Sequence, residues 1–382
     1  YPWSDMTVIV RHKVDRFRNL KSVDLSPSPG FNLIFGKNGS GKTSLLESIH
    51  VLSVGRSFRT HKIAPLVNTD ESELLVFSNI AGFEHGGIGL TKSRQGRTEL
   101  RAFGENQKNW QYVAELLPLQ VINTDSLSLL EGPAKGRRRF LDWAMFHVEH
   151  SFLSSWRAYR RAVTQRNALL RQLKEVGDRS YGKEFLSQIE IWEKEAASHG
   201  EAIHRGRNEF FETLRPVLTE TLEKLMPGFQ LDFDYKQGWD DELELLEAML
   251  ASRARDIRYG MTMSGPHRGD FTLTMPGRGK VSEVFSRGQL KLLVCSLKLA
   301  VGRLLYRSHS SDEKVQSDNC IYLVDDLAAE LDRGNQEKIL SLLAATGAQC
   351  FLTSIDPGDL PDFRQICSSE PGKFHVEHGK IQ

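Results

Sequence analysis

The segment Gly36-Lys37-Asn38-Gly39-Ser40-Gly41-Lys42-Thr43 constrains the fold of this 382-residue chain more than any other. It fits the pattern G-x-x-x-x-G-K-[ST], with a short apolar run (31–35) before it and residues of helical spacing (43–54) after it. In such a strand–loop–helix unit the glycines let backbone N–H groups surround phosphates, and the helix N-terminus adds a positive dipole. The segment therefore predicts a P-loop nucleotide site in an α/β fold.

The P-loop residues have expected roles at that site. Lys42 should reach the β and γ phosphates of ATP, and the hydroxyl of Thr43 should bind Mg²⁺. Ser44, the next residue, is included among the expected nucleotide contacts. ATP and Mg²⁺ are therefore the predicted cofactors.

Residues 321–326, IYLVDD, are expected to supply the second part of the site. The apolar run predicts a buried strand whose tip meets the nucleotide. Asp325 would hold Mg²⁺, directly or through water, and Asp326 would polarise the attacking water. Paired carboxylates also begin loops or cap helices, but behind a P-loop they indicate a catalytic set of Lys42, Asp325 and Asp326.

Residues 285–289, FSRGQ, are similar to the LSGGQ signature of ABC-type ATPases, with Arg287 in place of a glycine. Ser286, Gly288 and Gln289 would form a second phosphate-binding surface at the start of an apolar helix. The alternative interpretation is an ordinary serine N-cap.

Residues 328–332, AAELD, resemble the D-loop of the same superfamily. In that superfamily two heads close around two ATPs, and each head offers its signature to the other. The resemblance therefore implies an ATP-dependent homodimer in which Ser286 and Asp332 act in trans.

Two positions depart from the wider ABC pattern. The switch histidine expected after the strand at 350–354 is missing, and Thr353 or Ser354 stands in its place. The Q-loop glutamine is replaced by Asn123. Both differences suggest slow hydrolysis.

The order of apolar runs predicts a parallel core sheet, an antiparallel β meander and an inserted, mainly helical arm. The resemblance to ABC-type ATPases implies that this α/β part is an ABC-type ATPase head. The head is assigned to 6–130 and 255–382 and the arm to 131–254. In the arm, two helices of about 25–35 residues are expected to run antiparallel. Residues 1–5 are interpreted as a remnant of cloning, with Met6 as the native start.

Composition restricts the environment and the partners. No window of about 18 apolar residues exists, so a soluble, cytoplasmic protein without membrane contact is expected. The four cysteines form no CxxC pair and are interpreted as reduced thiols. Net charge is +1, but residues 131–174 hold ten Lys/Arg against three Asp/Glu, so a DNA site would be a local patch. The candidate DNA contacts are Arg56, Arg59, Lys135, Arg137, Arg138, Arg139, Arg157, Arg160 and Arg161.

Several further segments have no general ABC role, including GRSFRT (55–60), GRRRFLDWAMFHVE (136–149), TQRNALLRQ (164–172) and SGPHR (264–268). Together with the nucleotide motifs, they make the chain resemble the RecF family of bacterial DNA-repair ATPases from Met6 onward. The resemblance implies binding of gapped or duplex DNA by an ATP-bound dimer, with little sequence preference. It also implies partnership with RecR and RecO in placing RecA at single-strand gaps.

Other interpretations remain open. An ATPase subunit of a transporter would share the nucleotide motifs, but the roughly 240 residues between P-loop and signature are unusually long for one. A scaffold ATPase that uses dimerisation as a timer would suit the near-neutral charge. A nuclease is disfavoured because no carboxylate–histidine cluster remains outside the ATP site. His267 and Arg268 would either link the arm to the ATP site or form a turn.

Overall fold

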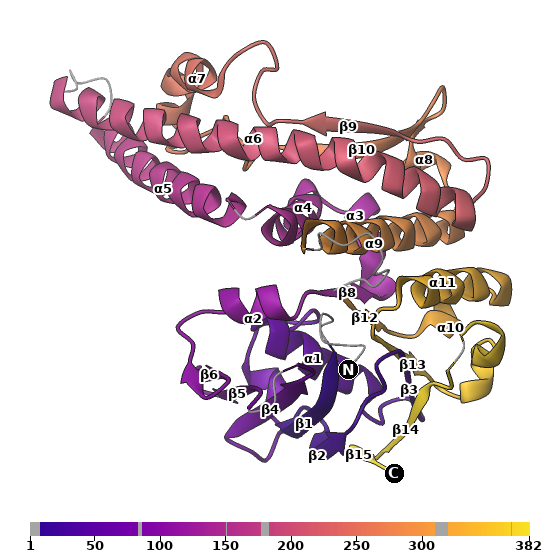
Figure 1. Ribbon diagram of the computed structural model, residues 1–382. Coiled ribbons are helices and arrows are strands. Elements are labelled where there is room, and N and C mark those ends of the chain that lie inside the picture. The colour runs from indigo at the N-terminus through magenta and orange to yellow at the C-terminus, as the bar shows by residue number, and fades with distance from the viewer. Residues whose placement is uncertain (1–7, 83–85, 150, 177–182, 310–319, 368) are drawn as a thin grey trace. The chain divides into compact units, whose positions relative to one another are not determined.

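The computed structural model describes residues 8–382 except 83–85, 150, 177–182, 310–319 and 368 (Figure 1). The chain divides into two compact units. Unit 1 comprises Tyr1–Ser126, Thr221–Pro227 and Arg287–Gln382, and unit 2 comprises Leu127–Glu220 and Gly228–Ser286. Residues 255–286, which the sequence assigns to the head, therefore group with the arm. The reason is strand pairing, because Phe271 of one strand faces Tyr235 of another across the arm's own sheet.

A mixed six-stranded sheet forms the core of unit 1, in the order β15-β14-β3-β13-β12-β8. Its strands β3, β13, β12 and β8 are parallel, as the strand–helix–strand order predicts. They are buried apolar runs because a parallel sheet is covered on both faces. The bounds are β3 (Phe31–Phe35), β8 (Leu119–Ile122), β12 (Ile321–Val324), β13 (Cys350–Ser354), β14 (Gly372–Glu377) and β15 (Lys380–Ile381).

A second sheet in unit 1 is antiparallel, in the order β2-β1-β4-β5-β6-β7. It contains the predicted meander, and alternate residues of β4 and β5 are buried. The bounds are β1 (Ile9–Phe17), β2 (Leu20–Leu25), β4 (Glu73–Ile80), β5 (Ile88–Ser93), β6 (Thr98–Ala102) and β7 (Glu105–Asn106). The turn between β1 and β2 proves important for the site.

Two helices of unit 1 were predicted: α1 (Lys42–Val54) after the P-loop and α9 (Arg287–His309) after the FSRGQ segment. Unit 1 also contains α2 (Gln111–Leu116), α10 (Leu327–Glu330) and α11 (Arg333–Thr346). Short 3₁₀ turns occur at η1 (Ala64–Leu66), η2 (Thr124–Leu127), η3 (Pro357–Asp359) and η4 (Phe363–Gln365). No helix in the described part of the chain is both long enough and apolar enough to cross a membrane. The fold class predicted from the sequence is confirmed.

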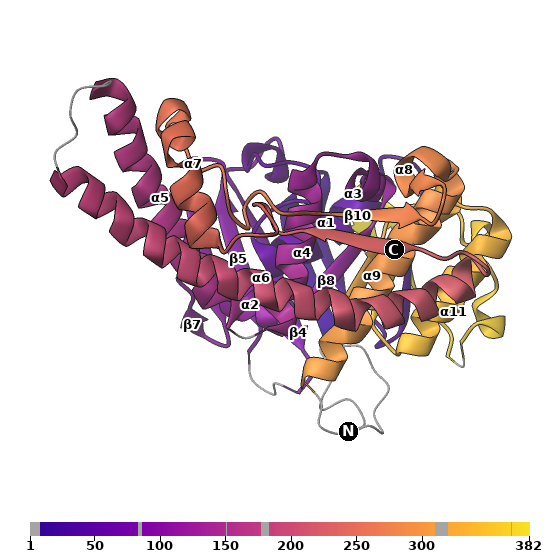
Figure 2. The same cartoon turned by 90° about the horizontal axis from the view of Figure 1, so that it is seen from above.

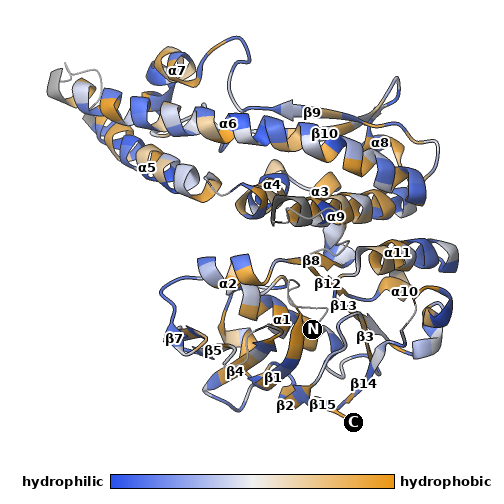
Figure 3. Ribbon diagram, in the orientation of Figure 1, coloured by the Kyte–Doolittle hydropathy of each residue, from blue (hydrophilic) through white to orange (hydrophobic). Residues whose placement is uncertain are grey.

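Unit 2 is mainly helical, with a small sheet in the order β11-β10-β9. Its elements are α3 (Ser128–Glu131), α4 (Ala134–Val148), α5 (Phe152–Val176), α6 (Lys183–Leu225), β9 (Asp232–Lys236), α7 (Leu245–Tyr259), β10 (Asp270–Met275), β11 (Gly279–Lys280) and α8 (Val281–Val284). Figure 2 shows α5 and α7 side by side, and Figure 3 shows hydrophilic residues recurring along α5 and α6. At 43 residues, α6 exceeds the expected length because it continues to Leu225, and Pro216 lies within it.

Buried ion pairs connect the helices α5, α6 and α7 of unit 2. Arg166 of α5 donates to Glu193 of α6 at 2.9 Å and to Asp256 of α7 at 2.8 Å. All three side chains are fully buried. Since a buried charge is costly unless it is paired, this cluster fixes one arrangement of the three helices.

Candidate nucleotide site

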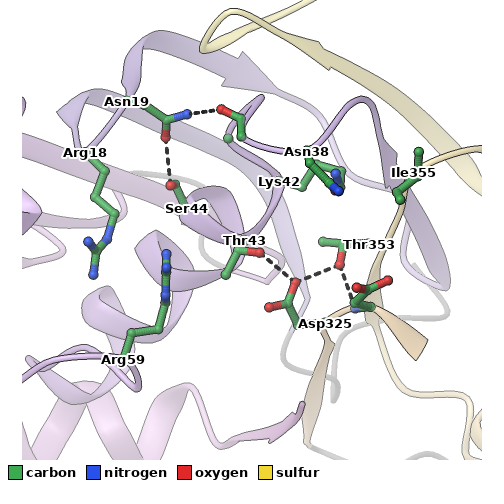
Figure 4. Close-up of a pocket in the computed structure, with 13 residues that line it drawn as sticks. Arg18, Asn19, Asn38, Lys42, Thr43, Ser44, Arg59, Asp325, Thr353 and Ile355 are labelled. Atoms are coloured by element: carbon green, nitrogen blue, oxygen red, sulfur yellow. Dashed lines mark hydrogen bonds between the residues drawn. The ribbon is translucent and has the colours of Figure 1, made fainter. Parts of the chain in front are cut away.

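A cavity of about 410 Å³ lies where the P-loop, β12, β13 and the β1–β2 turn of unit 1 meet (Figure 4). Its lining combines cations, carboxylates and hydroxyls with the backbone of the P-loop. The lining residues are Arg18, Asn19, Asn38, Gly39, Gly41, Lys42, Thr43, Ser44, Arg59, Asp325, Asp326, Thr353 and Ile355. The structure therefore brings together P-loop and β12 residues that lie about 280 positions apart in the sequence.

The glycines at the two ends of the P-loop are required by close packing. Gly36 has φ +149°, and a Cβ there would lie 2.2 Å from the carbonyl oxygen of Val376. Gly41 has φ +122°, and a Cβ there would lie 2.6 Å from Cδ2 of Leu20. The loop can therefore turn into α1 only with residues that lack a side chain.

Lys42 points back over the loop that precedes it. Its Nζ donates to the carbonyl oxygens of Gly36 at 2.7 Å and Lys37 at 3.1 Å. Burial lowers the pKa of Lys42, and the charges of Asp326 and Asp325 oppose this shift. The ammonium group thus occupies the loop's concave side, where a phosphate would replace the two carbonyls.

Two hydroxyl groups from separate segments converge on the carboxylate of Asp325 (Figure 4). Oδ1 of Asp325 accepts a hydrogen bond from the hydroxyl of Thr43 at 2.9 Å and another from Thr353 at 2.7 Å. Thr353 also accepts from the backbone N–H of Asp326 at 2.9 Å. Asp326 has left-handed backbone angles, φ 57° and ψ 47°, which a non-glycine residue adopts at a cost. Thr353 therefore holds the carboxylate of Asp325 and the backbone of Asp326.

The two candidates for the switch position differ in their surroundings. Thr353 lines the cavity, whereas the hydroxyl of Ser354 donates to the carbonyl oxygen of Asp356 at 2.9 Å and does not line it. Asn123 does not line it either, and its Oδ1 accepts from the hydroxyl of Ser126 at 2.8 Å. Thr353, Ser354 and Asn123 were the candidates for the two missing residues. Among them, Thr353 alone lines the cavity and contacts Asp325.

The β1–β2 turn supplies residues that the sequence analysis missed. Nδ2 of Asn19 donates to the carbonyl oxygen of Gly39, and its Oδ1 accepts from the hydroxyl of Ser44, both at 2.8 Å. Arg18 beside it donates to Glu47. No pattern in the sequence marks this turn, because only the pairing of β1 with β2 brings it to the P-loop.

Glu47 forms ion pairs with two arginines, Arg18 and Arg59, at the edge of the cavity. Its side chain is fully buried, accepts from Arg18 at 2.6 Å, and lies 3.8 Å from a guanidinium nitrogen of Arg59. Figure 4 shows Arg18 and Arg59 on the side of the cavity opposite Ile355. Arg59, which the sequence analysis places among DNA contacts, thus lies at the nucleotide site.

The predicted signature and D-loop do not line this cavity. Gly288 and Gln289 lie in the first turn of α9, directly after Ser286. Asp332 caps α11, where its side chain accepts from the backbone N–H of Asn335 at 3.0 Å. The residues of the predicted second phosphate-binding surface are therefore not part of the described P-loop cavity.

The candidate DNA residues fall into two groups within unit 2. Arg137 is paired with Asp270 at 2.7 and 2.9 Å, and Arg138 donates to the carbonyl oxygen of Gly269 at 3.0 Å, so both are used internally. The others project from α4 and α5 into solvent, and their side chains have no hydrogen-bond or ion-pair partner among the described residues. These are Lys135, Arg139, Arg157, Arg160 and Arg161. Arg56, in unit 1, is also exposed.

His267 is part of the interior of unit 2. Its Nδ1 accepts from the hydroxyl of Tyr159 at 2.5 Å, and its Nε2 donates to the carbonyl oxygen of Thr262 at 3.1 Å. Burial lowers the pKa of His267 to about 4. His267 is therefore a neutral structural residue, whereas Arg268 is exposed.

A parallel sheet with a P-loop after β3 and paired carboxylates after β12, in a chain that also has an antiparallel sheet and a helical insert, defines an SMC-type nucleotide-binding head. The family described as "RecF/RecN/SMC N terminal domain" matches residues 8–371. The DNA replication and repair protein RecF of Pseudomonas aeruginosa (strain LESB58) is 39% identical over 375 residues, which cover 98% of this chain and 97% of that protein. The chain belongs to the RecF family.

Two further similarities agree with this assignment. RecF of Shewanella baltica (strain OS223) is 40% identical over 377 residues, 98% of each chain. A solved structure of the recombination mediator protein RecF-ATPrS in the RecFOR pathway superimposes with a TM-score of 0.82 at 26% identity, covering 99% of this chain and 98% of that one. This family membership favours the DNA-repair interpretation over the transporter subunit.

Proposed function

We propose that this protein is an ATP-controlled DNA-binding protein of recombinational repair. Two copies would close around two ATPs, bind DNA at gaps or junctions, and help to place RecA together with RecR and RecO. The observation that supports this most directly is the convergence of Thr43, Asp325 and Thr353 in the P-loop cavity.

The residues present fit ATP. The hydroxyl of Ser40, in the middle of the P-loop, is buried and has no hydrogen-bond partner among the described residues. A phosphate oxygen would satisfy it, together with the loop's N–H groups. Lys42 would hold the β and γ phosphates, and Arg18, Asn19 and Arg59 would border the rest of the nucleotide.

The residues also fit Mg²⁺, but only with help from the nucleotide. No group of three or more His, Cys, Asp or Glu side chains in the described part of the chain is arranged to hold a metal. The hydroxyl of Thr43 and the carboxylate of Asp325 offer two oxygen ligands, and Mg²⁺ accepts phosphate oxygens and waters as the remainder. When bound, the ion would neutralise charge on the phosphates, while Asp326 would orient the attacking water.

Closure of a homodimer would complete the site. Ser286, Gly288, Gln289 and Asp332 do not line the cavity of their own chain, and a second copy would bring them to the γ phosphate. ATP would thus hold two copies together, and slow hydrolysis would separate them.

The exposed cations of unit 2 would provide the DNA contact. Lys135, Arg139, Arg157, Arg160 and Arg161 reach solvent without an internal partner, which suits phosphates and gives no base-reading pattern. Such a protein would work in the cytoplasm, where its DNA, RecR and RecO are found.

The test is fluorescence anisotropy of a labelled gapped duplex at two salt concentrations, with and without ATP and Mg²⁺. Binding that requires ATP, weakens with salt and is lost in Ser286→Arg is expected. If the purified protein binds ATP but no DNA under any condition, the DNA proposal is wrong and the scaffold interpretation takes its place.

A further inference from the structure

Arg268, at the end of the segment SGPHR, has no role in the proposed nucleotide site. It is exposed, and its guanidinium group lies against two thioethers. Nη2 is 3.6 Å from Sδ of Met261 and 3.2 Å from Sδ of Met263. This contact holds a cation beside the thioethers at the surface of unit 2.

Two of the neighbouring side chains are apolar and unusually exposed. Tyr259, the last residue of α7, is 54% exposed, and Met261 is 45% exposed. Gly260 between them packs against α5, because a Cβ there would lie 3.0 Å from Cγ of Arg171 and 3.6 Å from Cδ of Lys174. A ring, a thioether and cations therefore share one area, which we call the Tyr259 surface: Arg171, Lys174, Tyr259, Met261 and Arg268.

The Tyr259 surface continues a stripe of positive charge along α5. Arg157, Arg160 and Arg161 project from the same helical face as Arg171 and Lys174, given 3.6 residues per turn. Arg157 and Lys174 are about 26 Å apart along the helix, a length of several nucleotides. α5 contains six Lys/Arg, and its one acidic residue, Glu175, follows Lys174. This positively charged face of α5 is suited to binding successive phosphates of a nucleic-acid strand.

We propose that the Tyr259 surface binds an unpaired base of single-stranded DNA where the strand leaves a duplex held on the α5 stripe. This inference rests on the proposed DNA-binding function and specifies it. An exposed ring on a surface that also carries guanidinium groups offers a stacking face to any base, and the cations of that surface bind adjacent phosphates. A protein partner would also cover Tyr259, but the excess of cations over the one acidic residue of α5, Glu175, favours a polyanion.

The experiment measures anisotropy with the whole protein and ATP on two probes: a blunt duplex, and the same duplex with an oligo-dT tail. Tyr259→Ala removes the ring and Tyr259→Phe keeps it. Tyr112→Ala is the matched control, since Tyr112 is a similarly exposed tyrosine (44%) in unit 1. A tail carrying 2-aminopurine reports stacking directly, because its fluorescence falls when the base stacks.

The unchanged protein is expected to bind the tailed probe at least about fivefold more tightly than the blunt one. Tyr259→Ala should abolish that preference and the quenching of 2-aminopurine while leaving blunt-duplex binding unchanged. Tyr259→Phe and Tyr112→Ala should retain both. No preference for the tail, or a preference that survives Tyr259→Ala, would overturn this inference. Failure of the unchanged protein to bind either probe would instead refute the proposed function.

Discussion

The hydroxyl of Thr353 lies 2.7 Å from Oδ1 of Asp325 and donates a hydrogen bond to it. The hydroxyl oxygen of Thr353 also accepts from the backbone N–H of Asp326, so one threonine of β13 contacts both residues that follow β12. The strands explain why, since β12 and β13 are parallel neighbours and their carboxyl ends meet. Thr353 stands where the ABC pattern would have its switch histidine. It contacts Asp325 and Asp326 through a hydroxyl group instead of an imidazole.

Thr353→Val keeps the shape of the side chain and removes both hydrogen bonds. The N–H of Asp326 would lose its partner, a loss of about 1–3 kcal/mol for a buried group, and Asp325 would be less firmly oriented. ATP turnover should fall, and more Mg²⁺ should be needed for half-maximal rate. Thr353→Ser should restore both, and Ser354→Ala should change neither. An unchanged Mg²⁺ requirement in Thr353→Val would refute the positioning role.

Lys42→Ala removes the ammonium group from the P-loop. Charge-assisted hydrogen bonds to phosphate contribute about 1.5–3 kcal/mol each, so the affinity for ATP should fall about 10- to 100-fold. Equilibrium binding of a fluorescent ATP analogue measures this. Lys62→Ala, an exposed lysine outside the cavity, is the control. If the two variants bound ATP with equal affinity, the phosphates of ATP would not bind at Lys42.

Arg166→Met leaves the carboxylates of Asp256 and Glu193 buried with fewer partners. Breaking a buried pair by removing one member costs about 3–5 kcal/mol, moderated here because Arg253 also pairs with Glu193. Urea unfolding followed by circular dichroism should show this loss, whereas Arg161→Met at an exposed site should remain within about 0.5 kcal/mol of the unchanged protein. A small effect of Arg166→Met would mean that water reaches the cluster.

The combination Arg160→Gln with Arg161→Gln should weaken duplex binding and flatten its salt dependence. Each lost phosphate contact lowers the slope of log K against log salt by about 0.9. The matched control is Lys194→Gln with Arg205→Gln, which removes the same charge from exposed positions on α6. An equal loss of affinity in both pairs would show that net charge, rather than the α5 face, determines binding.

His267 should make stability depend on acidity. Its pKa is about 4 in the folded chain against 6.5 when unperturbed, so the unfolded state binds more protons between these values. The contribution of His267 is therefore present above pH 6.5 and is lost as the pH falls toward 4, by at most about 1.4 kcal/mol per pH unit. Urea unfolding of His267→Gln at several pH values should show a smaller loss over this range; an identical loss would assign it to other groups.

The fold could be predicted where the sequence has a regular apolar pattern. The nucleotide site could be predicted only in part. The P-loop, β12 and β13 carry their own signals, since a buried parallel strand is a continuous apolar run. Arg18 and Asn19 carry none, because they reach the cavity only through the pairing of two strands. The length of α6 was underestimated because the helix continues to Leu225, and its buried apolar residues continue with Leu218, Leu222 and Leu225.

The pentapeptide FHVEH occurs twice in the chain, and its two copies adopt different secondary structures. Phe146–Val148 end the helix α4, whereas the same residues at 374–376 lie in the strand β14. At the second position, His375 pairs with Phe35 in the core sheet. Tertiary pairing, absent from the pentapeptide itself, decides between helix and strand.

The most direct test of the shared nucleotide site is the solution mass of the protein, measured by light scattering with ATP and Mg²⁺. We expect the unchanged chain to shift from one copy to two. Ser286→Arg should remain a single copy while it binds ATP with unchanged affinity, because its own P-loop cavity is intact. An unchanged chain that stays single with ATP, or a Ser286→Arg protein that doubles its mass, would contradict the account.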